Sequence, residues 1–272
     1  MNNVALGQYF PGNSRIHRLD PRTKLLLLIL YIVVVFLIRQ ESYLHILLYI
    51  PVFAFLALCV RLSQVPLSYF VRSLKPMRFI LIFMFLLNFF FTSGEEILFR
   101  LGFITVYHKG LLQGIYIVLR LILLVRGTSV MTLTTSPTGL TDGLERLLSP
   151  LAKIHFPAHE LAMMMTIALR FIPTLMEEAD KIKKAQTARG ANFDNGSLVQ
   201  RAKSMLPILV PLFVSAFRRA DELAMAMESR CYHGGEGRTR MHQLHFHRGD
   251  GIAALSVVLL GVIIVLIQEL VL

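Results

Sequence analysis

Five long apolar stretches, separated by polar connections, divide the chain at residues 25–38, 44–60, 77–92, 111–135 and 251–271. A helix that crosses a membrane needs about 20 apolar residues, so each stretch predicts a membrane span, and the first and third are short. The pattern predicts an all-α, polytopic membrane protein with about five transmembrane helices. Four of them form an N-terminal membrane domain over residues 1–135, and the last occupies residues 251–272.

The polar block between these parts, residues 136–250, is the only region large enough for a domain outside the membrane. A short helix is expected over residues 140–149. A long amphipathic helix is expected from Ala158 to Ala188, because apolar residues recur there at intervals of three and four. Pro173 should kink this helix. Its apolar positions are Leu161, Met165, Ala168, Ile172, Leu175, Ala179 and Ile182.

A turn rich in glycine and asparagine follows at Gly190–Ser197, and a second long helix is expected over about 200–230. Its segment Met205–Phe217 is almost wholly apolar but too short to cross a membrane, so it should be buried or interfacial. Pro207 and Pro211, like the proline of the first long helix, are either hinges or simple kinks. The apolar face carries Leu206, Leu209, Phe213, Phe217, Ala220, Leu223 and Met227.

Each long helix ends in an arginine between two small residues. The triplets are Ala188-Arg189-Gly190 and Ser229-Arg230-Cys231. A cation at a helix C-terminus offsets the helix dipole, and a following glycine can cap the helix, so a purely local role is open. The repetition favours a second role, because an unshielded guanidinium can pair bidentately with a carboxylate on another protein.

Charge is arranged by side of the membrane. The chain has a net charge of +11 and 55% hydrophobic residues, with a mean hydropathy of +0.61. Basic residues concentrate before the first span and in the second connection, so the N-terminus and the polar block should be cytoplasmic and the C-terminus outside. The positive charge is therefore explained by the orientation of the chain in the membrane, which argues against nucleic-acid binding. Cys59 and Cys231 do not suggest a disulfide framework.

The sequence offers no catalytic set. It contains no G-x-x-x-x-G-K-[ST] phosphate loop and no local signature of a nucleophile with its base, so no catalytic residues and no cofactor are expected. His242, His245 and His247 do not have the spacing of a zinc site and precede the last span, where such residues anchor at the interface. No metal site is expected.

Three polar residues within the spans are candidates for a specific role: Arg120, Arg126 and Asn88. Arg120 and Arg126 are functional candidates because charge is costly inside a membrane. Alternatively, Arg120 pairs within the helix bundle and Arg126 extends to the cytoplasmic interface. Asn88 could hydrogen bond between helices. The sequence does not assign their roles.

Five segments together resemble the transmembrane T component of energy-coupling factor transporters. They are Leu19–Leu25 before the first span, Thr134–Leu144 at the start of the polar block, Ala168–Pro173, Ala185–Gly190 and Arg218–Arg230. The resemblance covers essentially the whole chain. The second triplet departs from the family form Ala-Arg-Gly, since it reads Ser-Arg-Cys.

The resemblance implies a non-catalytic subunit of an ATP-driven importer. Its partners would be two ABC-type ATPase subunits that hydrolyse ATP, an S component that binds a vitamin or metal ion, and the lipid bilayer. Residues 136–250 would form the cytoplasmic coupling domain. The ATPase-docking residues would be Ala188, Arg189, Gly190, Ser229, Arg230 and Cys231. The S component would contact Leu206, Leu209, Phe213 and Phe217, and the hinge candidates are Pro173, Pro207 and Pro211.

Two other classes of function fit less well. A self-sufficient secondary transporter would show matching halves with broken spans and ionisable residues near the midplane, and only Arg120 suggests this. A membrane-tethered regulator would need a basic recognition surface, whereas the polar block has nearly balanced charge. Neither accounts for the two arginine triplets. The sequence does not name the transported substrate.

Overall fold

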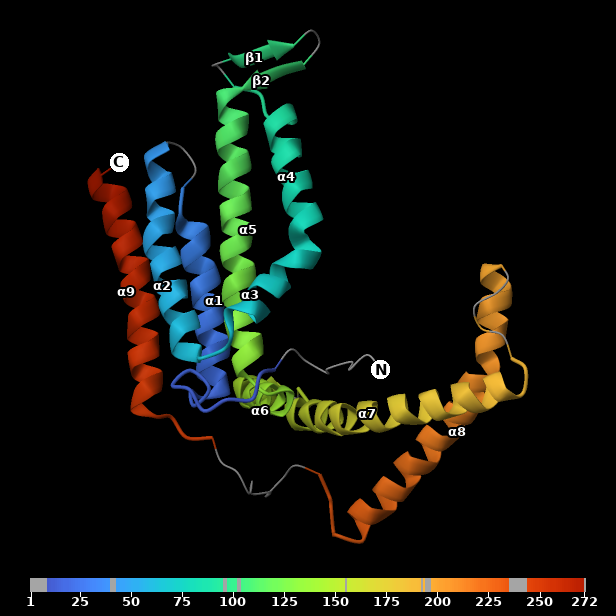
Figure 1. Cartoon of the computed structure of the whole chain (residues 1–272). Coiled ribbons are helices and arrows are strands. Elements are labelled where there is room, and N and C mark those ends of the chain that lie inside the picture. Colours follow the sequence, from blue (N-terminus) through green and yellow to red (C-terminus); the bar gives the residue numbers. More distant parts are fainter. Residues whose placement is uncertain are drawn as a thin grey trace. The chain divides into compact units, whose positions relative to one another are not determined.

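The computed structural model describes residues 9–39, 43–94, 97–101, 104–154, 156–191, 193, 197–234 and 244–271. The chain forms two compact units (Figure 1). The first unit comprises Met1–Gly143 and Gln243–Leu272, and the second unit comprises Leu144–His242. In chain order the elements are α1 (Pro21–Leu37), η1 (Tyr43–Leu48), α2 (Tyr49–Ser63), α3 (Leu67–Leu74), η2 (Lys75–Met77), α4 (Arg78–Phe91), β1 (Ile97–Leu101), β2 (Ile104–Tyr107), α5 (His108–Thr134), α6 (Pro137–Leu148), η3 (Ser149–Ile154), α7 (Ala158–Ala188), α8 (Leu198–Glu228) and α9 (Arg248–Val271).

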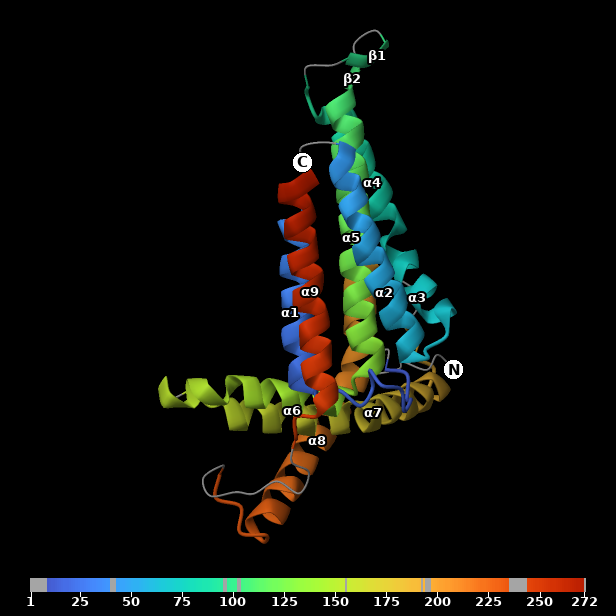
Figure 2. The ribbon, with the colours of Figure 1, turned by 90° about the vertical axis from the view of Figure 1, so that its left-hand side faces the viewer.

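The first unit is a bundle of long apolar helices. Helix α1 packs against α5 and α9, α2 packs against α5, and α4 runs along α5, as Figures 1 and 2 show from two sides. Strands β1 and β2 form an antiparallel hairpin between α4 and α5, with Arg100 opposite Thr105. The fold class is thus all-α as predicted, apart from this hairpin, which the apolar pattern did not indicate.

Four helical segments are long and apolar enough to cross a membrane by length and composition. They are Leu44–Ser63, Leu67–Phe91, His108–Thr134 and Arg248–Leu270. Helix α1 is also strongly apolar but has 17 residues, fewer than a full span needs. The protein is therefore a multi-pass membrane protein. That α1 forms a fifth span stays a prediction.

The core of the first unit joins α1, α2, α5 and α9. Val35 of α1, Val52 of α2, Leu123 of α5 and Ile264 of α9 are completely or almost completely buried in it. The hydroxyl of Tyr31 donates a hydrogen bond to the Leu123 carbonyl, 3.1 Å away, so the polar end of this buried ring is satisfied. Many other side chains of these helices are exposed and apolar, as expected where lipid is the solvent.

Two polar residues within the apolar helices have local partners. The Arg120 guanidinium donates to the carbonyl of Ile38, 2.8 Å away at the end of α1, and lies over the Phe36 ring. This contact is the pairing within the bundle that the sequence left as one alternative. The Asn88 side chain donates to the Met84 carbonyl of its own helix α4 at 2.8 Å, so this amide bonds within one helix instead of between helices.

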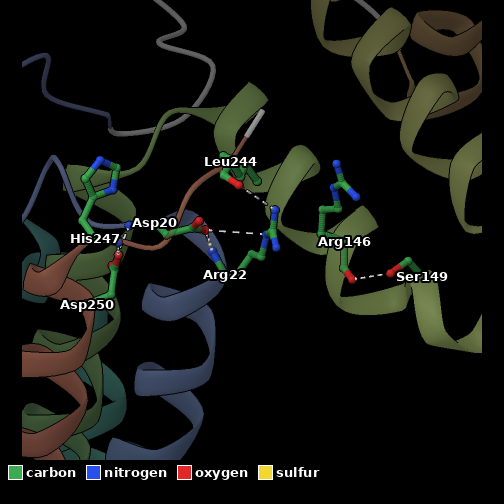
Figure 3. Close-up of polar contacts among 7 residues, drawn as sticks. All are labelled: Asp20, Arg22, Arg146, Ser149, Leu244, His247 and Asp250. Carbon is green, nitrogen blue, oxygen red and sulfur yellow. Dashed lines mark hydrogen bonds and ion pairs between the residues drawn. The ribbon is translucent and has the colours of Figure 1, made fainter. Parts of the chain in front are cut away.

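A buried polar junction closes one end of the first unit (Figure 3). One oxygen of Asp250 accepts the backbone N–H of Asp20 at 2.9 Å, and its other oxygen accepts that of His247 at 2.7 Å. Asp20 in turn caps α1 by accepting the Arg22 N–H at 2.9 Å. The Lys24 ammonium donates to the Thr134 carbonyl at the end of α5, 2.8 Å away. These contacts hold the starts of α1 and α9 against the end of α5.

The second unit is built mainly from α7 and α8. Helix α7 has the bounds expected from its periodicity, and α8 begins at Leu198 because Ser197 and Gln200 form a reciprocal capping box. The two helices run in opposite directions. The Gln186 side chain of α7 donates to the Pro207 carbonyl near the start of α8, at 3.5 Å, while Tyr232 just after α8 donates to the sulfur of Met163, at 3.0 Å.

Candidate docking site

The first arginine triplet closes α7 with a left-handed glycine. The N–H of Gly190 donates to the Thr187 carbonyl, and the N–H of Ala191 donates to the Gln186 carbonyl, at 2.9 and 3.0 Å. This is the Schellman arrangement, in which the residue after the helix cap takes a positive φ. Gly190 has a φ of +89°, and Arg189 is the cap residue directly before it.

The second triplet repeats this backbone arrangement at the end of α8. The N–H of Cys231 donates to the Glu228 carbonyl at 2.8 Å, and the N–H of Tyr232 donates to the Met227 carbonyl at 3.1 Å. Cys231 has a φ of 56° and so occupies the position that glycine occupies in the first triplet. Arg230 is again the residue directly before the left-handed position. The second triplet therefore differs from Ala-Arg-Gly in its residues but has the same backbone conformation as the first.

Both arginines are available to a partner. All six residues of the two triplets are exposed, and neither guanidinium has an ion pair or hydrogen bond with any residue in the described ranges. Because α7 and α8 run in opposite directions, Arg189 and Arg230 lie at opposite ends of the helix pair. The second unit thus presents two separate cationic ends, each at the C-terminus of a long helix.

The left-handed backbone of the two triplets leads to a pair of opposite predictions. Replacing Cys231 by glycine should stabilise the protein by about 0.5–1 kcal/mol, because a side chain in this conformation costs roughly 1–2 kcal/mol and added chain freedom offsets part of the gain. Gly190→Ala should destabilise it by about 1 kcal/mol, although nothing crowds the site of the added Cβ. Thermal unfolding of the purified chain measures both. A Cys231→Gly variant no more stable than the parent would contradict the strain at this position.

A polar contact fastens the two long helices near their middle. One oxygen of Glu178 on α7 accepts the Ser215 hydroxyl at 2.5 Å, and the other lies 3.0 Å from the Arg219 guanidinium on α8. The hydrogen bond from Ser215, assisted by Arg219, holds the pKa of the Glu178 carboxyl below its ordinary value, although partial desolvation opposes this effect. The carboxylate is therefore charged at neutral pH and ties α7 to α8.

The residues predicted to contact an S component form an exposed apolar stripe on α8. Leu206, Leu209, Phe213 and Phe217 are 53%, 43%, 61% and 67% exposed. The later part of the predicted face is directed toward α7 instead. Its residues Ala220, Leu223 and Met227 line a hollow of about 490 Å³ between α8 and α7. The exposed part of the stripe is therefore the part that the described residues of the second unit leave uncovered.

The three prolines lie inside helices that continue through them. Proline lacks an N–H, so Pro211 leaves the carbonyl of Pro207, four residues earlier, without its usual helical donor. Gln186 of α7 supplies a donor to that carbonyl. A break in the α8 hydrogen-bond ladder is thus coupled to a contact between helices. A hinge role for Pro173, Pro207 or Pro211 remains a prediction.

Sequence reasoning did not find the buried polar junction of the first unit, in which Asp250 bonds to the backbone of Asp20 and Lys24 bonds to Thr134. The sequence signals near it were the Asp-Pro dipeptide at 20–21, which is typical of a helix start, and the family resemblance of Leu19–Leu25. As for metals, the described residues contain no cluster of three or more potential ligands. His242 lies outside the described ranges, whereas His245 and His247 lie within them.

Comparison with known proteins identifies the class to which these features belong. Several relatives carry the name energy-coupling factor transporter transmembrane protein EcfT. The relative from Brevibacillus brevis is 54% identical and covers 97% of this chain and 98% of its own length. The relative from Thermosediminibacter oceani is 53% identical over 96% and 97%, and that from Bacillus subtilis is 47% identical over 97% and 98%.

The names of these relatives place the chain in the class of transmembrane components of energy-coupling factor transporters, as the sequence resemblance indicated. The family model described as cobalt transport protein, CbiQ, matches residues 12–242. The chain belongs to this family.

Proposed function

We propose that the chain is the coupling subunit of an importer, in which it joins two cytoplasmic ABC-type ATPases to a membrane-embedded S component. The ATPases would hydrolyse ATP, and this chain would transmit their movement without catalysing a reaction itself. The S component would bind the substrate, a vitamin or another micronutrient such as a metal ion. The membership of the chain in a transporter family supports this division of labour.

The pair of matched arginine ends carries the proposal. Arg189 and Arg230 are exposed, stand on the same backbone arrangement, and have no acidic partner among the described residues. Each would insert into one ATPase and pair with a carboxylate there. A helix cap alone would not require two long helices to end in the same way with both guanidinium groups unpaired.

The exposed stripe Leu206, Leu209, Phe213 and Phe217 would contact the S component. Its apolar side chains suit a partner that is itself embedded in the membrane. In this arrangement the N-terminus and the second unit face the cytoplasm and the C-terminus lies outside, which agrees with the basic residues before α1 and between α2 and α4. Pro173, Pro207 and Pro211 would let the long helices bend as the ATPases close.

The alternative of a self-sufficient secondary transporter depended on Arg120 as an ionisable group near the midplane. Since this guanidinium donates to the Ile38 carbonyl and lies over Phe36, it has a role in closing the end of α1. Arg120 therefore lends no support to a substrate site between the spans.

Uptake into vesicles tests the proposal. Vesicles that contain this chain, both ATPases and an S component should accumulate the substrate of that S component when ATP is supplied on the ATPase side. Omitting this chain, or replacing one ATPase by a hydrolysis-deficient variant, should reduce uptake to background. Uptake by the chain alone, driven by an ion gradient without ATP, would instead establish the secondary transporter.

A further inference from the structure

A groove of about 410 Å³ lies within the first unit between α1, α2, α5 and α9. Its walls are apolar and include Leu27 and Tyr31 of α1, Phe55 of α2 and Val130 of α5. At its rim, Leu58 of α2 is 54% exposed and Ile252 of α9 is 70% exposed. Both residues belong to helices that are apolar enough to cross a membrane, so in a bilayer this exposed side of the groove would face lipid.

The groove has a polar end and an apolar end. At the polar end it is bounded by Arg15, Lys24, Thr134 and Gly249, which lie at or before the helix ends joined by the buried junction. Along α1 it extends from Lys24 to Tyr31, about two turns or roughly 10 Å into the apolar part of the bundle. Its axis therefore runs from an interfacial position toward the membrane interior.

The positive charge at the polar end is only partly balanced. The Lys24 ammonium is bonded to the Thr134 and His17 carbonyls and faces Asp250 and Asp20. Arg15 is exposed and, within the described ranges, has no acidic partner. The unbalanced charge at the mouth of the groove is therefore that of Arg15.

We infer that this groove binds an anionic phospholipid, with one acyl chain along the apolar walls and the phosphate at Arg15. In a bilayer, lipid acyl chains are the apolar groups next to a groove between membrane helices. Each methylene group that such a chain buries in the groove favours binding. Basic pockets between membrane helices at the interface are suited to anionic head groups. The acyl chain of a neutral lipid would occupy the groove equally well, but its head group would leave Arg15 without a counter-charge. The inference depends on the membrane location alone and is independent of the ATPase partners.

Native mass spectrometry of the purified full chain, released from nanodiscs of phosphatidylglycerol and phosphatidylethanolamine, tests the inference. The parent should retain one phospholipid and prefer phosphatidylglycerol. Arg15→Gln should reduce that preference by about fivefold, the effect of one basic residue at a membrane surface. Ala253→Phe, which places a ring in the groove, should remove the retained lipid.

Each variant has a matched control. Arg18→Gln removes an exposed charge three residues away, and Leu255→Phe places a ring on the exposed face of the same helix, so neither should change the retained lipid. Equal retention by Ala253→Phe and the parent would overturn the groove as the site. Equal retention of both lipids by the parent would overturn the role of Arg15.

Cysteine alkylation provides a readout that does not depend on a folded variant. Cys59 lines the groove, whereas Cys231 is exposed at the end of α8. In the parent chain, phosphatidylglycerol should slow alkylation of Cys59 by an apolar maleimide and leave Cys231 unchanged, as peptide mapping would show. Alkylation of Cys59 at the same rate with and without the lipid would contradict occupancy of the groove.

Discussion

Replacing both Arg189 and Arg230 by glutamate is expected to abolish the assembly of this chain with its two ATPases and, with it, ATP-driven uptake. Removing one member of a buried charge pair at an interface costs about 2–5 kcal/mol, and a glutamate would add repulsion from the partner carboxylate. Because the two ends lie far apart on the helix pair, the two losses should add. Co-purification with the ATPases and uptake into vesicles measure the effect.

The single variants and controls separate docking from a local role in the helix ends. Arg189→Lys keeps the charge but loses the planar fork, so weakened assembly would indicate bidentate pairing. Lys184→Glu reverses an exposed charge on α7 outside the triplet and should leave assembly intact. If the double glutamate variant still assembles and transports, both arginines serve only the helix dipole, which is worth about 0.3–1 kcal/mol.

Replacing Asp250 by alanine is expected to destabilise the first unit by about 3–5 kcal/mol. The change removes the acceptor of two backbone N–H groups, at Asp20 and His247, and takes away a negative charge that faces the buried Lys24. Asp20, Lys24 and Asp250 are only 4%, 6% and 4% exposed, so water cannot replace the lost partner. Thermal unfolding of the purified chain measures the loss.

Two further substitutions on α9 complete this experiment. Asp250→Asn keeps one acceptor oxygen and the size of the side chain. The stability of this variant should therefore lie between that of the parent and that of the alanine variant. Glu269→Ala removes an exposed carboxylate near the other end of the helix and should be nearly neutral. An alanine variant at position 250 that unfolds at the same temperature as the parent would show that the junction does not stabilise the bundle.

Periodicity alone predicted the long helices well. The expected range of α7, Ala158–Ala188, agrees with the structure, because its apolar spacing is regular and Gly190 stops it. The expected start of α8 was off by two residues, since the capping box of Ser197 and Gln200 sets its first turn. The β1–β2 hairpin was missed because it lies in the connection between the expected spans 77–92 and 111–135, where two short strands leave little alternation of apolar and polar residues to detect.

Contacts between distant residues could not be predicted in the same way. Asp250 bonds to the backbone of Asp20 across 230 positions, and no local pattern connects a helix start with another so far away. The repeated pattern of an arginine between two small residues indicated the triplets, and the resemblance to the family implied their docking role, but neither revealed their shared backbone geometry. That Cys231 occupies a left-handed position became visible only from the backbone, because cysteine rarely adopts it.

The Glu178–Arg219 ion pair has a mechanical consequence for the two arginine ends. Arg189 lies eleven residues beyond Glu178 on α7, and Arg230 lies eleven residues beyond Arg219 on α8. At the rise of an α-helix, both arms are about 16 Å long, and they point in opposite directions. The two arginine ends therefore stand at equal distances from this ion pair, on opposite sides of it. Two partners that bind the ends would act on the helix pair symmetrically about the Glu178–Arg219 contact.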